Sequence, residues 1–144
     1  LAGVELSVDG KRVEPSKTFN YKGLMYSGVP NLASSFGYTN ASWTLKCDLT
    51  CEYVCRLLNH MDRRGLKQAT PQKNPVVDEA PWLDFSSGYV QRGVGQFPKQ
   101  GVKKPWKLNQ NYALDLLALR FGAVTDEAME FSKPKAPERE KISA

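Results

Sequence analysis

Apolar side chains recur at helical spacing in the middle of the chain, and this is its clearest periodic pattern. The positions are Leu45, Leu49, Val54, Leu57, Leu58 and Met61, with charged residues between them. This spacing predicts an amphipathic helix that opens within 37–46 and runs to about Met61. Asn40 or Ser42 is placed to cap its start by accepting a backbone N–H, and Gly65 can end it in a left-handed conformation. The sequence therefore marks both ends of this helix.

Short runs before the helix predict strands. Leu6 to Val13 has the pattern of a hairpin around an Asp9-Gly10 turn. Phe19 to Met25 is a strand of mixed polarity. Leu32 to Phe36 is a short strand of small and apolar residues, the kind that fits beneath a ligand or inside a parallel sheet.

The second half of the chain is less regular. Leu66 to Pro75 is expected to be extended, and a short helix is expected from Ser87 to Val94. A second helix is predicted from Tyr112 to Phe121, and a weaker helical turn from Asp126 to Phe131. From about Ser132 onward the chain is charged and contains proline, which predicts a mobile tail.

Three or four strands and a few helices make the chain α+β when it is taken alone. The short apolar strand at 32–36 needs neighbours on both sides to bury its backbone and side chains. The sequence contains no Gly-x-Gly-x-x-Gly turn and no phosphate loop. This combination is typical of the closing portion of a larger α/β fold followed by an extension.

The composition is that of a globular domain with a basic surface. The chain has 144 residues, 41% of them hydrophobic, and a formal net charge of +5. Its basic clusters carry no recognised nucleic-acid-binding motif, which favours a solvated surface over a nucleic-acid site. Attraction toward an anionic cofactor such as NADPH is a third interpretation. No secretion signal precedes the odd number of cysteines, so a reducing cytoplasm is expected.

The cysteines and the single histidine give little sign of a catalytic or metal site. Cys47, Cys51 and Cys55 fall four residues apart and form one stripe on the predicted helix. They lack a fourth metal ligand, so core packing is the better interpretation and no metal is expected. His60 falls at the end of the helix, as a favourable cation there or simply as part of the surface.

The segment from Gly37 to Lys46 joins the short apolar strand to the long helix. A glycine turn at such a junction lets the backbone approach a ligand, and the helix start offers free N–H groups and a positive end. Such an end suits an electron-rich ligand. The alternative from the residues alone is that Asn40 and Ser42 merely cap the helix while Trp43 is a hydrophobic anchor.

The same segment resembles one in flavin-dependent monooxygenases of the Baeyer–Villiger, ethionamide-activating type, and the resemblance extends over nearly the whole chain. It is carried by Tyr21-Lys22-Gly23, 37–46, Ser87-Gly88-Tyr89, 98–101 and 105–112. The resemblance implies that residues 1–65 are the C-terminal portion of a Rossmann-like FAD-binding domain. It implies that residues 66–144 are a C-terminal extension, with the mobile tail from about 132.

For the intact protein, the resemblance implies reduction of FAD by NADPH and insertion of one oxygen atom from O₂ into a ketone, or oxygenation of sulfur or nitrogen. The expected flavin-lining residues are Gly37, Tyr38, Thr39, Asn40, Ser42, Trp43 and Thr44. Tyr38 and Trp43 would act by packing and Asn40 by hydrogen bonding, with Ser42 and Thr44 acting through the helix start. No catalytic residue is expected in this chain itself.

The motifs that are absent from the chain limit what it is expected to do alone. The glycine-rich turns that hold FAD and NADPH in this family are absent from it, so it is expected to be inactive without the remainder of the enzyme. An incomplete sheet leaves unpaired edges, so the isolated chain is expected to self-associate. The alternatives are a basic nucleic-acid-binding module or a protein-interaction module without catalysis.

Overall fold

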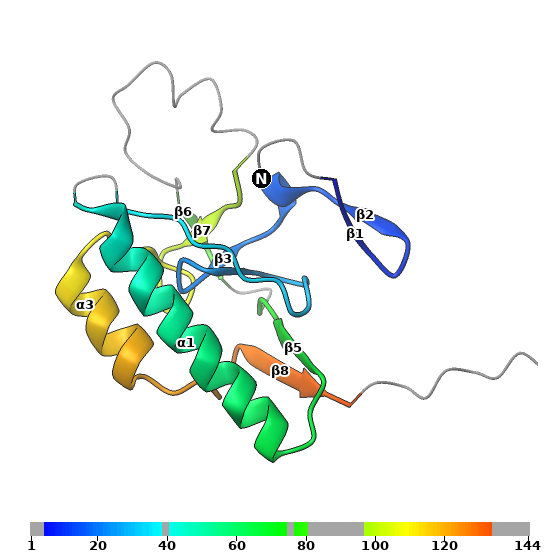
Figure 1. Cartoon of the computed structure of the whole chain (residues 1–144). Coiled ribbons are helices and arrows are strands. Elements are labelled where there is room, and N and C mark those ends of the chain that lie inside the picture. The colour runs from blue at the N-terminus through cyan, green and yellow to red at the C-terminus, as the bar shows by residue number, and fades with distance from the viewer. Residues whose placement is uncertain (1–4, 39–40, 75–76, 81–96, 134–144) are drawn as a thin grey trace, which may run out of the picture.

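The computed structural model describes residues 5–38, 41–74, 77–80 and 97–133 of the chain. These residues form a small mixed α/β structure in which one long helix lies beside several short antiparallel strand pairs (Figure 1). The expected helix from Ser87 to Val94 lies outside the described residues, as does nearly all of the expected tail. The division of the chain near Gly65 stays a prediction.

The first hairpin forms as predicted. Strands β1 (Leu6–Val8) and β2 (Lys11–Val13) pair antiparallel, with Leu6 opposite Val13. Asp9 and Gly10 both have positive φ angles, 50° and 75°. This is the backbone that a tight two-residue turn between twisted strands requires, and Asp-Gly adopts it readily.

The expected strand from Phe19 to Met25 is instead a second hairpin. A short 3₁₀ turn, η1 (Pro15–Lys17), leads into β3 (Asn20–Tyr21), which pairs antiparallel with β4 (Met25–Tyr26). Gly23, at φ 78°, makes the reversal, and the Leu24 N–H donates to the Tyr21 carbonyl at 3.0 Å. The mixed polarity of this segment therefore reflects a turn within it.

The long helix is confirmed as α1 (Trp43–Arg63), and Gly65 follows it with a φ of 61°. Its buried face differs from the predicted one. Leu49, Leu57 and Met61 are buried, but Leu58 is 57% exposed and Leu45 37%. The buried stripe is completed by polar or amphipathic side chains, namely Lys46, Thr50 and Tyr53.

The prediction that the cysteines pack in the core is wrong. Cys51 and Cys55 are exposed and Cys47 is half-buried. Their stripe points away from the buried face of α1, because the core side of the helix is set by Leu49, Tyr53 and Leu57. Helical spacing predicts that the three thiols share a face, but it does not say which side of the helix is covered.

The prediction of a helical turn from Asp126 to Phe131 is wrong. Strand β8 (Met129–Ser132) pairs antiparallel with β5 (Gln68–Pro71), and Gln68 lies opposite Ser132. The extended conformation expected after Gly65 is confirmed within β5. A strand this short is decided by its distant partner more than by its own sequence, and that partner is far away in the chain.

The predicted second helix is present in two parts. The α-helical turns of α3 (Tyr112–Leu116) continue into a π-helical turn, η3 (Leu117–Phe121), and Gly122 ends it. The Asn111 side chain caps α3 by accepting from the Leu114 N–H at 3.1 Å. A fourth strand pair, β6 (Glu79–Ala80) with β7 (Gln100–Gly101), lies beside β3.

The predicted strand from Leu32 to Phe36 does not form. Its one ladder contact is an isolated bridge between Ala33 and Met25. Among the described residues this bridge to β4 is its only strand contact, and a single bridge does not make a ladder of hydrogen bonds. The segment is extended and leads directly to the Gly37–Tyr38 turn.

One core joins the two halves of the chain. Tyr21, Leu24, Leu49 and Tyr53 are fully buried in it, together with Trp106, Leu119 and Met129 from the second half. α1 lies alongside α3 and η3 (Figure 1), and Arg56 donates from α1 to the backbone carbonyls of Leu119 and Gly122 at 2.7 and 2.6 Å. The second half therefore fixes the surroundings of the α1 start.

Candidate functional site

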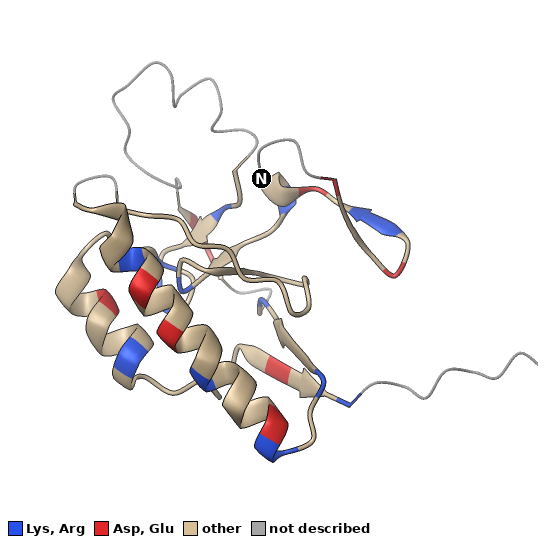
Figure 2. Ribbon diagram, viewed as in Figure 1, with Lys and Arg blue, Asp and Glu red and all other residues tan. Residues whose placement is uncertain are grey.

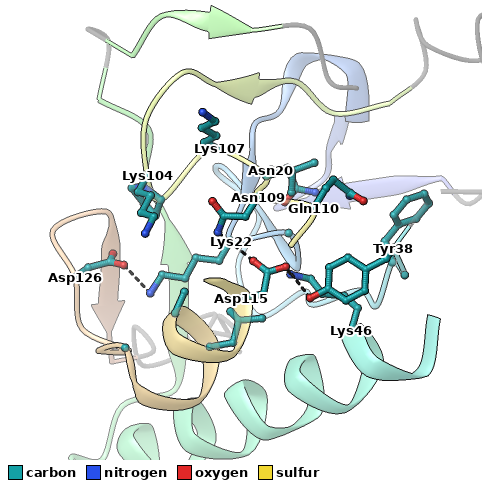
Figure 3. Close-up of a pocket in the computed structure, with 18 of the residues that line it drawn as sticks. Asn20, Lys22, Tyr38, Lys46, Lys104, Lys107, Asn109, Gln110, Asp115 and Asp126 are labelled. Carbon is teal, nitrogen blue, oxygen red and sulfur yellow. Dashed lines mark hydrogen bonds and ion pairs between the residues drawn. The ribbon is translucent and has the colours of Figure 1, made fainter. Parts of the chain in front are cut away.

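A cavity of about 330 Å³ lies next to the turn that precedes α1. Its walls come from the β3–β4 reversal, the first turn of α1, the segment 104–110 and α3 with η3 (Figure 3). This volume is at the small end of the range for pockets that hold organic ligands. The polar side chains that line it are Asn20, Lys22, Tyr38, Lys46, Lys104, Lys107, Asn109, Gln110, Asp115, Asp126 and Glu127.

The buried carboxylate of Asp115 is the centre of this wall. Its Oδ2 accepts from the Lys46 Nζ at 2.8 Å and from the Tyr38 hydroxyl at 2.9 Å, and its Oδ1 accepts from the Asn109 Nδ2 at 3.1 Å (Figure 3). Asp115 is only 4% exposed and Lys46 5%. A buried ion pair is stable only when its remaining hydrogen-bonding capacity is also used, and here a phenol and an amide use it.

A second ion pair lies on the other side of the cavity. The Lys22 Nζ contacts the Asp126 Oδ2 at 2.8 Å and donates to the Ala123 carbonyl at 2.9 Å. The Asp126 Oδ2 also accepts from the Tyr21 hydroxyl at 2.8 Å, and Tyr21 lies 3.2 Å from the Tyr53 hydroxyl. This pair therefore ties the β3–β4 hairpin and α1 to the segment before β8.

Tyr38 is buried, and its hydroxyl is committed to Asp115. Burial, together with that hydrogen bond, raises the pKa of Tyr38 above its ordinary value. The hydroxyl therefore stays protonated and donating at neutral pH. Thr39 and Asn40, two of the predicted site residues, lie outside the described residues.

The first residues of α1 are open to solvent. Ser42 occupies the N-cap position but makes no capping hydrogen bond, and its hydroxyl lies 2.8 Å from that of Thr44. The first turn carries no acidic residue. Of the two predicted caps, the Ser42 side chain is therefore wrong, and Asn40 lies outside the described residues.

Trp43 folds back over the turn rather than into the core. It is 56% exposed, and its ring lies 5.2 Å from that of Phe36. A Cβ added at Gly37 would lie 2.3 Å from the Trp43 Cγ. Glycine is therefore required at this position because the Trp43 side chain occupies the space that any other residue would use.

Replacing Gly37 by alanine is expected to displace the Trp43 ring, because no Cβ can lie 2.3 Å from a ring atom. The Trp43 ring would lose its contact with Phe36, and its fluorescence should shift toward that of a fully solvated indole. Leu58→Ala, at an exposed position later in the same helix, serves as the control and should leave the Trp43 emission unchanged. Unchanged Trp43 emission in Gly37→Ala, measured with Trp82 and Trp106 replaced by phenylalanine, would contradict this account of the turn.

The structure brings some of the predicted site residues to the cavity and leaves others outside it. Gly37 and Tyr38 line the cavity, whereas Ser42, Trp43 and Thr44 are exposed beside it. Lys46 and Asp115, which hold the cavity wall, were not among the predicted site residues. Lys46 is the last residue of the segment 37–46, but its pairing with Asp115 joins positions far apart in the chain, and no local pattern predicts it.

The described residues include no group of three or more His, Cys, Asp or Glu side chains arranged to hold a metal ion. No helix among them is long and apolar enough to cross a membrane. Basic and acidic residues are interspersed along α1 (Figure 2).

Comparison with known proteins gives consistent relatives. The chain is 47% identical over 138 residues to the FAD-containing monooxygenase EthA of Mycobacterium tuberculosis, covering 95% of this chain and 28% of that protein. It is 47% identical over 137 residues to the protein of the same name from Mycolicibacterium smegmatis. It is 42% identical over 135 residues to an Acinetobacter protein named "Probable FAD-binding monooxygenase AlmA", covering 92% of this chain and 27% of that protein.

No protein-family model and no solved structure matches the chain. The chain spans 28% of the length of the EthA proteins. The similarity nevertheless extends over nearly all of the chain itself, at identities well above those at which only a fold is shared. The chain is therefore a homologue of one part of the FAD-containing monooxygenases.

Proposed function

We propose that this chain is the flavin-lining, C-terminal part of an FAD- and NADPH-dependent monooxygenase that inserts one oxygen atom from O₂ into a ketone, or oxygenates sulfur or nitrogen. The relatives are named FAD-containing monooxygenases, which supports FAD and oxygenation. NADPH and the Baeyer–Villiger reaction rest on the sequence resemblance. Without the rest of the enzyme the chain is inactive.

One observation supports the site best: the open start of α1 beside the Gly37–Tyr38 turn. The Ser42 side chain makes no capping hydrogen bond, and among the described residues no acidic side chain in the first turn offsets the positive end of the helix. An electron-rich ring edge placed there would accept hydrogen bonds and meet a favourable field. FAD supplies the redox chemistry, and this chain binds and orients one edge of its ring.

Individual residues have distinct roles in this proposal. The exposed Trp43 ring offers an apolar surface to the flavin or to the substrate. Tyr38 acts by packing and not through its hydroxyl, because the hydroxyl already donates to Asp115. Thr44, with Thr39 and Asn40, completes the polar surroundings. The cavity lined by Gly37 and Tyr38 is where a small organic substrate would enter beside the ring.

The segment at 32–36, which forms no strand of its own, fits the same proposal. Among the described residues it meets a strand only at the single bridge between Ala33 and Met25 of β4. In the intact enzyme we infer that it joins a parallel, Rossmann-like sheet contributed by the rest of the protein. The isolated chain would then self-associate through the backbone groups and apolar side chains that this sheet covers.

The test is flavin binding by the full-length protein of which we propose this chain to be a part. Trp43→Ala is expected to weaken FAD binding about tenfold, the loss expected from removing one aromatic contact. NADPH oxidation that produces no oxygenated product should also rise. Leu58→Ala is the matched control, since Leu58 is a 57% exposed apolar residue on the same helix, far from the turn.

Equal FAD affinity in the Trp43→Ala, Leu58→Ala and unaltered proteins would overturn the site assignment. A full-length protein that purifies without flavin, and fails to take up added FAD, would overturn the proposed function itself. The nucleic-acid alternative predicts affinity for a generic duplex that falls steeply with salt. The names of the relatives do not favour it.

A further inference from the structure

The Asp115 carboxylate lies behind the turn that we assign to the flavin, on a segment distant from it in sequence. We propose that Asp115 is a positioning residue, which fixes the Gly37–Tyr38 turn and the first turn of α1 in the place from which they contact FAD. The inference rests on the proposed function. It adds a residue from outside the 37–46 motif to the machinery of the site.

The contacts of Asp115 converge from both sides of the turn. Tyr38 lies just before the start of α1 and Lys46 lies in its first turns, and both donate to the same oxygen, at 2.9 and 2.8 Å. One carboxylate oxygen of Asp115 therefore binds residues on both sides of the junction between the turn and α1. The Asn109 amide holds the other oxygen at 3.1 Å and fixes the rotation of the carboxylate.

Asp115 is itself held in place, so it acts as a fixed point. The Asn111 side chain caps α3, and the Arg56 guanidinium binds the Leu119 and Gly122 carbonyls at the far end of η3. Leu119 is 1% exposed and packs in the core. A displacement of Asp115 would have to carry this anchored segment with it.

The charge of Asp115 also matters to the helix start. Lys46 places a buried ammonium group close to the positive end of α1, which is unfavourable without a compensating anion. Asp115 is the carboxylate that contacts this ammonium group. Without it, the Lys46 side chain gains by moving toward water, and that movement pulls on the first turn of the helix.

The first experiment uses the full-length protein freed of flavin and measures backbone amide exchange by NMR. The Lys46 and Cys47 amides close the first turn of α1, whereas the Leu57 and Met61 amides lie in its buried second half. In Asp115→Asn the Lys46 and Cys47 amides are expected to exchange at least about tenfold faster relative to Leu57 and Met61, as for loss of a hydrogen bond to a charged group. Tyr38→Phe removes one donor only, and a smaller change of the same kind is expected.

Glu52→Gln is the matched control. Glu52 is bound by Arg120 and so joins the same two elements, α1 and η3, without touching the turn. In Glu52→Gln, the Lys46 and Cys47 amides should exchange at the same rate as in the unaltered protein. If Tyr38→Phe and Asp115→Asn exchange like the control at these amides, the positioning role is overturned. If Asp115→Asn fails to fold, Tyr38→Phe decides the question alone.

The second experiment measures FAD affinity and the visible flavin spectrum in the full-length protein. Asp115→Asn is expected to weaken FAD binding about tenfold and to shift the flavin bands. Asp115→Glu, which keeps the charge, should recover much of both, and a merely structural role would not give this recovery.

Faster exchange with unchanged FAD affinity would overturn the link to the flavin. Faster exchange in a protein that binds no FAD at all would overturn the proposed function and leave the positioning of the turn standing.

Discussion

Replacing Lys46 by methionine is expected to lower the free energy of unfolding by about 3–5 kcal/mol, the range found when one partner of a buried ion pair is removed. Asp115 would then keep a buried negative charge with only the Tyr38 hydroxyl and the Asn109 amide as donors. Both side chains of the pair are 6% exposed, so water cannot compensate. Urea unfolding followed by circular dichroism measures the change.

The double variant Lys46→Met, Asp115→Asn is the informative control for this prediction. It removes both charges, and replacing a buried ion pair by neutral groups of similar size is often close to neutral. We expect it to recover most of the lost stability. Additive losses from the two single substitutions would contradict the coupling that the 2.8 Å contact implies.

Raising the pH above about 10 is expected to destabilise the protein steeply, through Tyr53 and Tyr21. Burial raises the pKa of Tyr53 to about 12, and burial together with Tyr53 and Asp126 raises the pKa of Tyr21 further. The folded state thus favours the neutral phenol. The stability that this preference contributes is fully present below about pH 10, where unfolded tyrosine titrates. It is lost as the pH rises through the pKa values of the folded state.

The expected loss from Tyr53 alone is about 3 kcal/mol, since each pKa unit corresponds to about 1.4 kcal/mol. Urea unfolding between pH 7 and pH 12, with phenolate absorbance recorded in parallel, measures it. Tyr53→Phe should flatten the alkaline decline, whereas Tyr112→Phe, which alters a 38% exposed side chain, should not. An equal decline in all three proteins would show that other groups control alkaline unfolding.

The features that the sequence predicts correctly are those that local chemistry decides. Asp9-Gly10 makes its turn because both residues tolerate positive φ, and Gly65 follows the end of α1 for the same reason. Hydrophobic spacing predicts α1 itself, and Gly122 marks the end of the second helix. Each of these signals lies within a few residues of the element that it specifies.

The features that the sequence does not predict are decided between distant segments. The strand β8 forms because β5 offers it an edge, and the strand expected at 32–36 is missing because a single bridge, from Ala33 to Met25, is all that joins it to a described strand. The buried side of α1 is determined by its packing against η3 and the hairpin β3–β4. The cysteines therefore lie on the side that these elements do not cover. The Lys46–Asp115 pair is of the same kind, since a charged residue on a helix is ordinarily a surface residue.

The pairing of β5 with β8 has a consequence for the order in which the chain acquires its structure. The β1–β2 turn and α1 need only neighbouring residues, so they can form as soon as they are synthesised. β5 must wait for Met129 to Ser132, because those residues supply the other strand of its ladder. Closing so long a loop is slow, and until then the backbone edge of β5 is exposed to other chains. Ribosome-bound chains that stop before Met129 are therefore the species in which aggregation is expected to begin.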